Sequence, residues 1–203
     1  MSDPAPFAFA LFAFALGIFA LRFIGVTAAT VVGGPLSEAL TYAVLVAGVA
    51  ETIAGILSLV KGDTYSGYIT GIFGIWLLGF FLLSTKGAGQ QDFRPDAVSW
   101  FVLLLIVPIA IMAIPAFAHR NVAFMIIFIA VVGLLLFLGL GYHSLDGAVT
   151  SAAASKSAPD LSGAAHLLKV SGWFSAVGAV VVWFVFAHAV LTATGVIREK
   201  SVS

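Results

Sequence analysis

The sequence predicts an all-α membrane protein, a six-transmembrane-helix bundle that forms a single domain over residues 1–203. Of its 203 residues, 62% are hydrophobic and 9% are charged, with a mean hydropathy of +1.16. A soluble domain has about 25% charged residues, so this chain cannot cover a water-facing surface. Its apolar stretches reach roughly 18 residues or more, as transmembrane helices do, and lack the short alternating pattern of barrel strands.

The predicted spans cover residues 7–32, 40–60, 65–83, 98–117, 122–141 and 167–196. The first apolar run is too long for a signal peptide and follows a leader without Lys or Arg, so it is expected to be a membrane helix. An even number of spans places both termini on one side. Lys and Arg divide almost evenly between the two sets of connections, so the positive-inside rule does not choose that side.

The connections predict the helix order in space. In "KGDTYSG" (61–67), Gly62 can end a helix in the left-handed conformation, and Asp63 or Thr64 can cap the next helix, which gives an antiparallel hairpin. "HRN" (119–121) is an equally tight turn. The segments 84–97 and 142–166 are interpreted as polar loops, with a short surface helix in the second as the alternative.

Small residues form faces on two predicted helices, at Gly48 and Gly55 and at Gly67, Gly71 and Gly74. In lipid such faces let helix backbones approach closely, so packing is the favoured interpretation, and the lining of a narrow path is the alternative.

The beginning of the chain reads "DPAPFAFALFAF". Asp3 suits a helix cap, and Pro4 or Pro6 suits the first turn, which needs no amide hydrogen there. Phe7 and Phe14 share one helix face, and Phe9 and Phe12 share another. One of these two faces is expected to point into the bundle.

Two stretches resemble the acetate uptake transporter family of bacteria and fungi. "DPAPFAF" resembles its Asn-Pro-Ala-Pro-Leu-Gly-Leu signature, which matches here at Asp3, Pro4, Ala5 and Pro6. "AGVAETIAGILSLVKGDTYSGYITGIFGIW" (47–76) resembles its second helix, turn and third helix. Arg120 with Phe124, and Gly172 with Trp173, are weaker matches.

This resemblance implies a membrane path for acetate and other small carboxylates, a homo-hexamer with one path per protomer, and residence in the bacterial inner membrane with both termini cytoplasmic. It also implies a constriction formed by two aromatic residues and one aliphatic residue, at Phe12, Phe73 and Ile129. Ile129 is placed only by counting from Arg120. The chain departs from the family pattern with Asp3 for Asn, Phe73 for Tyr and Glu51 for Gln.

A ring of these three side chains would exclude water and hydrated ions. A charged carboxylate would lose its hydration there at a high cost, so the neck favours the protonated acid or an anion accompanied by a proton. Hydroxyl groups on the expected path are Thr52, Ser58, Tyr68 and Thr70. Backbone hydrogen bonding is the alternative role for each of them.

Glu51 stands in the otherwise apolar run "VLVAGVAETIAGILSLV". A central charge costs on the order of 2.5–3.5 kcal/mol on insertion scales, and such residues usually face a bundle interior or a water path. The hypothesis is that Glu51 faces the path and exchanges a proton coupled to substrate. The alternative is a protonated Glu51 that only hydrogen-bonds to a neighbouring helix.

Two other classes of function have less support in the sequence. An accessory subunit of a larger membrane complex would use the same glycine faces for assembly. An enzyme or b-type haem protein would need facing histidines, and only His188 lies well inside a span. No cysteine is present and the net charge is zero, so no disulfide, thiolate metal site, cofactor or nucleic-acid partner is expected. Arg22 is expected to reach the membrane interface, with attraction of anions as the alternative.

Overall fold

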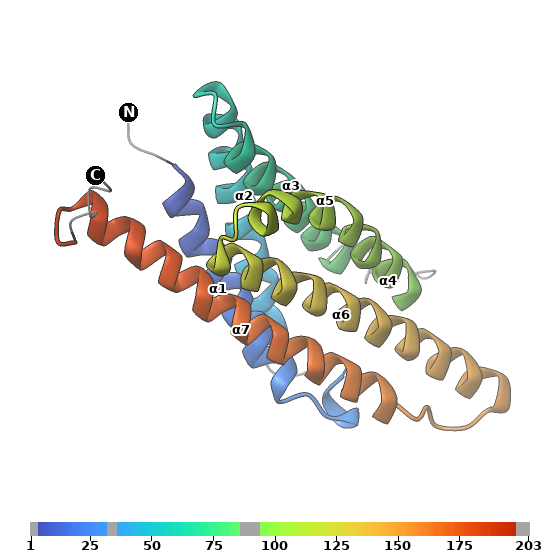
Figure 1. The fold of residues 1–203 in the computed structure, drawn as a ribbon. Helices are drawn as coiled ribbons and strands as arrows, with labels where there is room; N and C mark the ends of the chain where they lie inside the picture. The colour runs from blue at the N-terminus through green and yellow to red at the C-terminus, as the bar shows by residue number, and fades with distance from the viewer. Residues whose placement is uncertain (1–3, 32–35, 86–93, 198–203) are drawn as a thin grey trace.

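The structure is a computed structural model that describes residues 4–31, 36–85 and 94–197 (Figure 1). These residues form helices and contain no strand. The elements in chain order are α1 (Ala5–Ile24), the short 3-10 helix η1 (Ala28–Thr30), α2 (Ser37–Val60), α3 (Thr64–Thr85), α4 (Pro95–Leu104), α5 (Ile106–Ala118), α6 (Val122–Ser155) and α7 (Ser162–Ala193).

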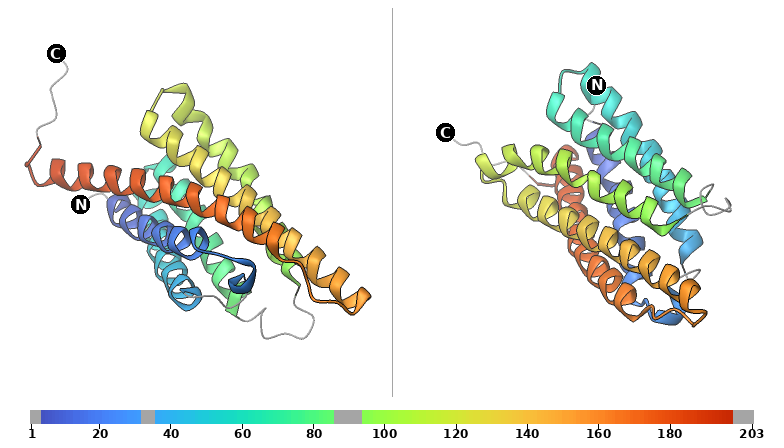
Figure 2. Two further views of the ribbon diagram at one scale, coloured as in Figure 1. Left: turned by 90° about the horizontal axis from the view of Figure 1, so that it is seen from below. Right: turned by 90° about the vertical axis from the view of Figure 1, so that its right-hand side faces the viewer.

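Within the described residues, six helical segments are long and apolar enough to cross a membrane, and α4 and α5 together form the fourth of them. Helix α1 packs against α2 and α7, α2 packs against α3, and α6 packs against α4, α5 and α7 (Figures 1 and 2). The beginning of α1 and the end of α7 lie at the same end of the bundle. This arrangement confirms the predicted fold class.

Two helix boundaries differ from the prediction by more than five residues. Helix α1 ends at Ile24, before Gly25, whereas the apolar pattern suggested residue 32. Helix α6 continues for 34 residues to Ser155, through a segment predicted as a polar loop. That segment is rich in Ala, the strongest helix former, so the helix extends beyond the apolar run.

The fourth span is broken at Leu105, between α4 and α5. Pro108 lies one turn later and has no amide hydrogen to donate to the carbonyl of Leu104. The predicted single helix over residues 98–117 is therefore two consecutive helices.

The hairpin between α2 and α3 forms as predicted. Gly62 has a φ of +83°, the left-handed conformation, and the carboxylate of Asp63 accepts a hydrogen bond of 3.2 Å from the amide of Ser66. The glycine faces meet in this hairpin, because a Cβ on Gly55 would lie 2.5 Å from the amide nitrogen of Gly71. Close helix packing is thus the role of this face.

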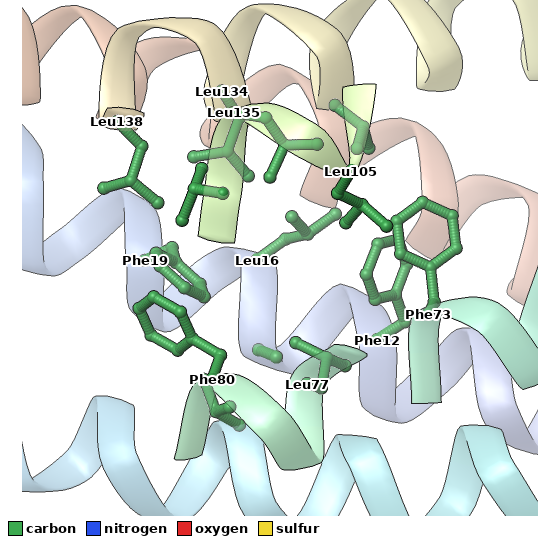
Figure 3. Packing of buried hydrophobic residues seen from close by; sticks show 14 of the residues in the cluster. Phe12, Leu16, Phe19, Phe73, Leu77, Phe80, Leu105, Leu134, Leu135 and Leu138 are labelled. Carbon is green, nitrogen blue, oxygen red and sulfur yellow. The ribbon is translucent and has the colours of Figure 1, made fainter. Parts of the chain in front are cut away.

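The core lies between the first, third and fifth spans, as Figure 3 shows. Helices α1 and α3 run in the same direction, since Phe12 meets Phe73 and Phe19 meets Phe80. Leucines of α6 cover these rings from the third side: Leu134, Leu135 and Leu138.

Candidate functional site

Two pairs of phenylalanines meet across the axis of the bundle. The ring centroids of Phe12 and Phe73 are 4.9 Å apart, and those of Phe19 and Phe80 are 5.9 Å apart. Both pairs are buried (Figure 3). The second pair lies seven residues further along each helix, which corresponds to about 10 Å of helix axis. The axis is therefore closed by aromatic rings at two levels; the first pair, Phe12 and Phe73, is called the aromatic neck below.

A small enclosed cavity, the inner cavity, lies against the aromatic neck. It leaves about 20 Å³ for the centres of water-sized molecules, which is room for one or two waters. Its lining combines residues of five helices: Phe9, Phe12, Glu51, Ile69, Phe73, Phe124, Ile127, Phe128, Val182 and Val185. Among these side chains Glu51 is the single polar one.

Glu51 is 1% exposed, and its Oε1 has no hydrogen-bond partner among the described residues. It lies on the face of α2 that packs against α3, where a Cβ on Gly74 would collide with the backbone of Thr52. This close packing fixes the backbone beside Glu51. The structure thus buries Glu51 in the lining of an apolar cavity next to the aromatic neck.

Two further cavities continue along the axis on the other side of the neck. The first cavity has a volume of only about 10 Å³, and its lining side chains are apolar, including Phe12, Phe19, Phe73 and Leu77. The second has a volume of about 410 Å³ and is called the polar cavity, since Arg22, Ser37, Thr41, Ser84 and Tyr142 lie among its lining residues. Phe80 also lines it. The axis therefore carries a carboxyl on one side of two aromatic closures and a guanidinium on the other.

Arg22, which the sequence predicted at the membrane interface, is buried within the protein. It is 6% exposed, and its Nη2 donates hydrogen bonds to the carbonyls of Thr30 and Val31 at 3.0 and 3.1 Å. Arg22 also lines the polar cavity.

Ile129 does not complete the aromatic neck, and its predicted placement is wrong. It is 54% exposed and lines a separate apolar cavity with residues of α5 and α7. The inward positions of α6 at this level are Phe128 and Val131, each 2% exposed. Successive helix residues differ by about 100° in direction, so the count from Arg120 selected a position on another face.

The hydroxyl residues expected on the path do not line the inner cavity. Thr52 and Thr70 donate to carbonyls of their own helices, those of Gly48 and Ser66. Ser58 is buried, and its Oγ has no partner among the described residues. Tyr68 is 55% exposed on the outside of α3.

The signature residues shape the start of α1. Pro4 is the N-cap, and Ala5 and Pro6 are the first two helical residues, while Asp3 lies outside the described residues. Phe7 and Phe14 point outward, with 62% and 45% of their surfaces exposed.

The inward face of α1 carries Phe9 and Phe12. Phe9 meets Phe124 edge to face with ring centroids 6.0 Å apart, so one of the weaker sequence matches belongs to this site. Val182 and Val185 of α7 also line the inner cavity, but nothing distinguishes them from other apolar residues in the sequence.

His188 is exposed on α7, and no cluster that could hold a metal ion occurs within the described parts of the chain. No pair of histidines suited to haem faces the bundle interior there.

The fold and the site define a polytopic membrane protein with a narrow, largely apolar axis through the bundle. The model of the GPR1/FUN34/yaaH family matches residues 1–198, so the chain belongs to this family, as its motifs predicted. A solved structure described as that of the bacterial acetate channel SatP is similar over 100% of this chain and 99% of its own, with a TM-score of 0.75 and 17% sequence identity. A comparison with curated proteins finds no match.

Proposed function

We propose that the protein conducts acetate and other small carboxylic acids across the membrane along the axis of its helix bundle. The observation that carries this proposal is Glu51 in the inner cavity beside the aromatic neck. Membership of the GPR1/FUN34/yaaH family and the similarity to an acetate channel support the substrate class, and they favour a channel or transporter over an enzyme.

The apolar character of the aromatic neck determines the protonation state in which the substrate passes. Contacting rings of Phe12 and Phe73 leave no room for a hydration shell, and their faces offer no hydrogen bond. An anion would lose its hydration there without compensation, whereas a neutral acid loses much less. The substrate therefore passes as the protonated acid or together with a proton.

Glu51 is the group proposed to handle that proton. Glu51 lines the inner cavity, which lies on the path proposed for the acid beside the neck. A carboxyl group can donate and accept hydrogen bonds, so it can pair with a carboxylic acid and exchange a proton with it. If Glu51 has only a structural role, a glutamine of similar shape will serve equally well.

The assembly and orientation are part of the proposal. The chain is proposed to form a homo-hexamer with one path per protomer, in a bacterial inner membrane with both termini cytoplasmic. The beginning of α1 and the end of α7 lie at the same end of the bundle, which is consistent with both termini on one side of the membrane. The polar cavity then opens toward the outer face, because it lies at the other end of α1.

Uptake of labelled acetate into proteoliposomes tests this function. Wild type and Glu51→Gln are compared with and without an inward proton gradient, and empty liposomes correct for the leak of acetic acid through lipid. We expect wild type to exceed the leak and respond to the gradient, and Glu51→Gln to lose the response. Equal responses would remove the proton role of Glu51, and uptake no faster than in empty liposomes would remove acetate conduction.

A further inference from the structure

Arg22 carries a buried positive charge that the proposed path does not explain. It lies near the end of α1, and 6% of its surface is exposed. Its Nη2 is held by the carbonyls of Thr30 and Val31. Two carbonyl dipoles orient the guanidinium but do not neutralise it, and an uncompensated buried charge is costly.

No carboxylate pairs with Arg22 among the residues that the structure describes. At this end of the bundle Arg94 forms an ion pair with Asp146 at 3.0 Å, and a ring nitrogen of His143 forms a hydrogen bond with Asp96 at 2.8 Å. These two acids are thus engaged with other partners, and a bound anion would supply the counter-charge that Arg22 lacks within the described residues.

The polar cavity offers a place for that counter-charge. It has a volume of about 410 Å³, and Arg22 lines it together with the hydroxyl residues Ser37, Thr41, Ser84 and Tyr142. Thr41 already donates to the carbonyl of Ser37 at 3.0 Å. A guanidinium and hydroxyl groups around a partly apolar space suit a ligand with one carboxylate and a short apolar tail.

We propose that Arg22 and the hydroxyl groups of the polar cavity bind a small carboxylate in its anionic form. The choice of a carboxylate among anions rests on the proposed function. The site concentrates the anion at one mouth of the path, before the aromatic closures at Phe80 and Phe73. The anion takes up a proton from the water at this mouth of the path and then leaves Arg22 as the neutral acid, because the apolar axis beyond offers no counter-charge.

Equilibrium binding of radiolabelled acetate to the purified, detergent-solubilised protein tests the site. The assay is run at neutral pH, where the anion dominates. Arg22→Gln keeps donors for the carbonyls of Thr30 and Val31 but removes the charge. We expect it to bind acetate about tenfold more weakly or worse. Arg94→Gln is the control, since it removes one positive charge at the same end from a side chain that is 64% exposed.

A second variant and a competition assay complete the test. Tyr142→Phe removes one hydroxyl from the cavity and leaves the charge, so we expect a smaller loss of acetate affinity even if Arg22→Gln does not fold. Formate is expected to compete with labelled acetate, and acetamide, a neutral analogue of similar shape, is not. The site is refuted if Arg22→Gln binds like wild type, if folded Tyr142→Phe binds like wild type while Arg22→Gln is unfolded, or if acetamide competes as well as formate.

The binding assay and the flux assay test the site and the proposed function independently. Binding that depends on Arg22 in a protein without acetate flux supports the site and contradicts the proposed function. Flux above the lipid leak, with acetate affinity unchanged in Arg22→Gln, contradicts the site alone.

Discussion

Phe12 of α1 and Phe73 of α3 lie in contact across the bundle axis, with ring centroids 4.9 Å apart and ring planes inclined at 44°. The contact closes the axis without any polar atom from these two side chains. Glu51 lies on one side of it, and the polar cavity with Arg22 lies beyond the second pair of rings on the other.

Phe12→Ala is expected to widen the neck and relax its selection by size. Carboxylic acids larger than acetate should gain permeation relative to acetate by about tenfold, because steric selection in apolar sites is of this order. Proteoliposomes with an internal pH dye measure the rates. Phe14→Ala is the matched control, since Phe14 lies on the same helix with 45% of its surface exposed. Equal selectivity in the two variants would show that Phe12 does not limit passage.

Thr41→Cys is expected to make acetate flux sensitive to a water-soluble thiol reagent. Thr41 lines the polar cavity, while its neighbour Tyr42 is 67% exposed on the outside of α2. The chain contains no cysteine, so the reagent acts only at the introduced thiol. Flux should fall after labelling of Thr41→Cys and stay unchanged in Tyr42→Cys. Labelling of the thiol at position 41 without loss of flux would place the polar cavity off the path.

Gly55→Val is expected to loosen the α2–α3 hairpin. A Cβ at this position would lie 2.5 Å from the backbone of Gly71, so the helices must separate. Overpacking of this kind costs about 1–3 kcal/mol of unfolding free energy. Thermal unfolding in detergent measures the change. Gly147→Val is the control because a Cβ there meets nothing within 4 Å, and equal melting temperatures would contradict the packing role of Gly55.

Ser175→Ala is expected to weaken the contact between α7 and α1. The buried Oγ of Ser175 donates to the carbonyl of Leu16 at 2.8 Å. Hydrogen bonds between membrane helices contribute about 0.6 kcal/mol on average, so a small drop in thermal stability should follow. Ser155→Ala provides the comparison, because Ser155 donates to Ser151 within its own helix. A loss no greater than in this control would argue against a stabilising role for the bond.

Asp160 is expected to make the start of α7 sensitive to acid. The backbone amide of Ser162 donates to its carboxylate at 3.0 Å and lowers the pKa of Asp160 below its usual value. The stabilisation is complete above the unfolded pKa, about 4, and is lost as pH falls through the lower folded value. Asp160→Ala should therefore melt earlier than wild type at neutral pH and alike in strong acid. A melting difference that persists in strong acid would contradict this.

The fold was predictable from sequence because its signals are local. Apolar length located the spans, and Gly62 and Asp63 marked the hairpin between α2 and α3. The end of α6 was missed because the Ala-rich continuation to Ser155 is polar by composition but still favours a helix. The break at Leu105 could have been expected from Pro108.

The site was predictable only in part. Phe12, Phe73 and Glu51 lie close together in the structure, and the sequence motifs that carry them already singled them out. Ile129 was placed by a long count within a helix, where an error of one residue turns a side chain by about 100°. The buried position of Arg22 depends on hydrogen bonds to the carbonyls of Thr30 and Val31. The periodicity of the sequence gives no sign of these contacts.

The central claim is tested most directly by measuring acetate flux after a larger side chain has been introduced into the inner cavity. Val182 lines that cavity and is 2% exposed, whereas Val180 is 64% exposed on the same helix. Both are replaced by Trp, and labelled acetate uptake is compared for variants with wild-type melting temperatures. We predict that acetate uptake by Val182→Trp falls to the level of empty liposomes and that Val180→Trp conducts like wild type. Equal conduction by two such stable variants would contradict a path through this cavity.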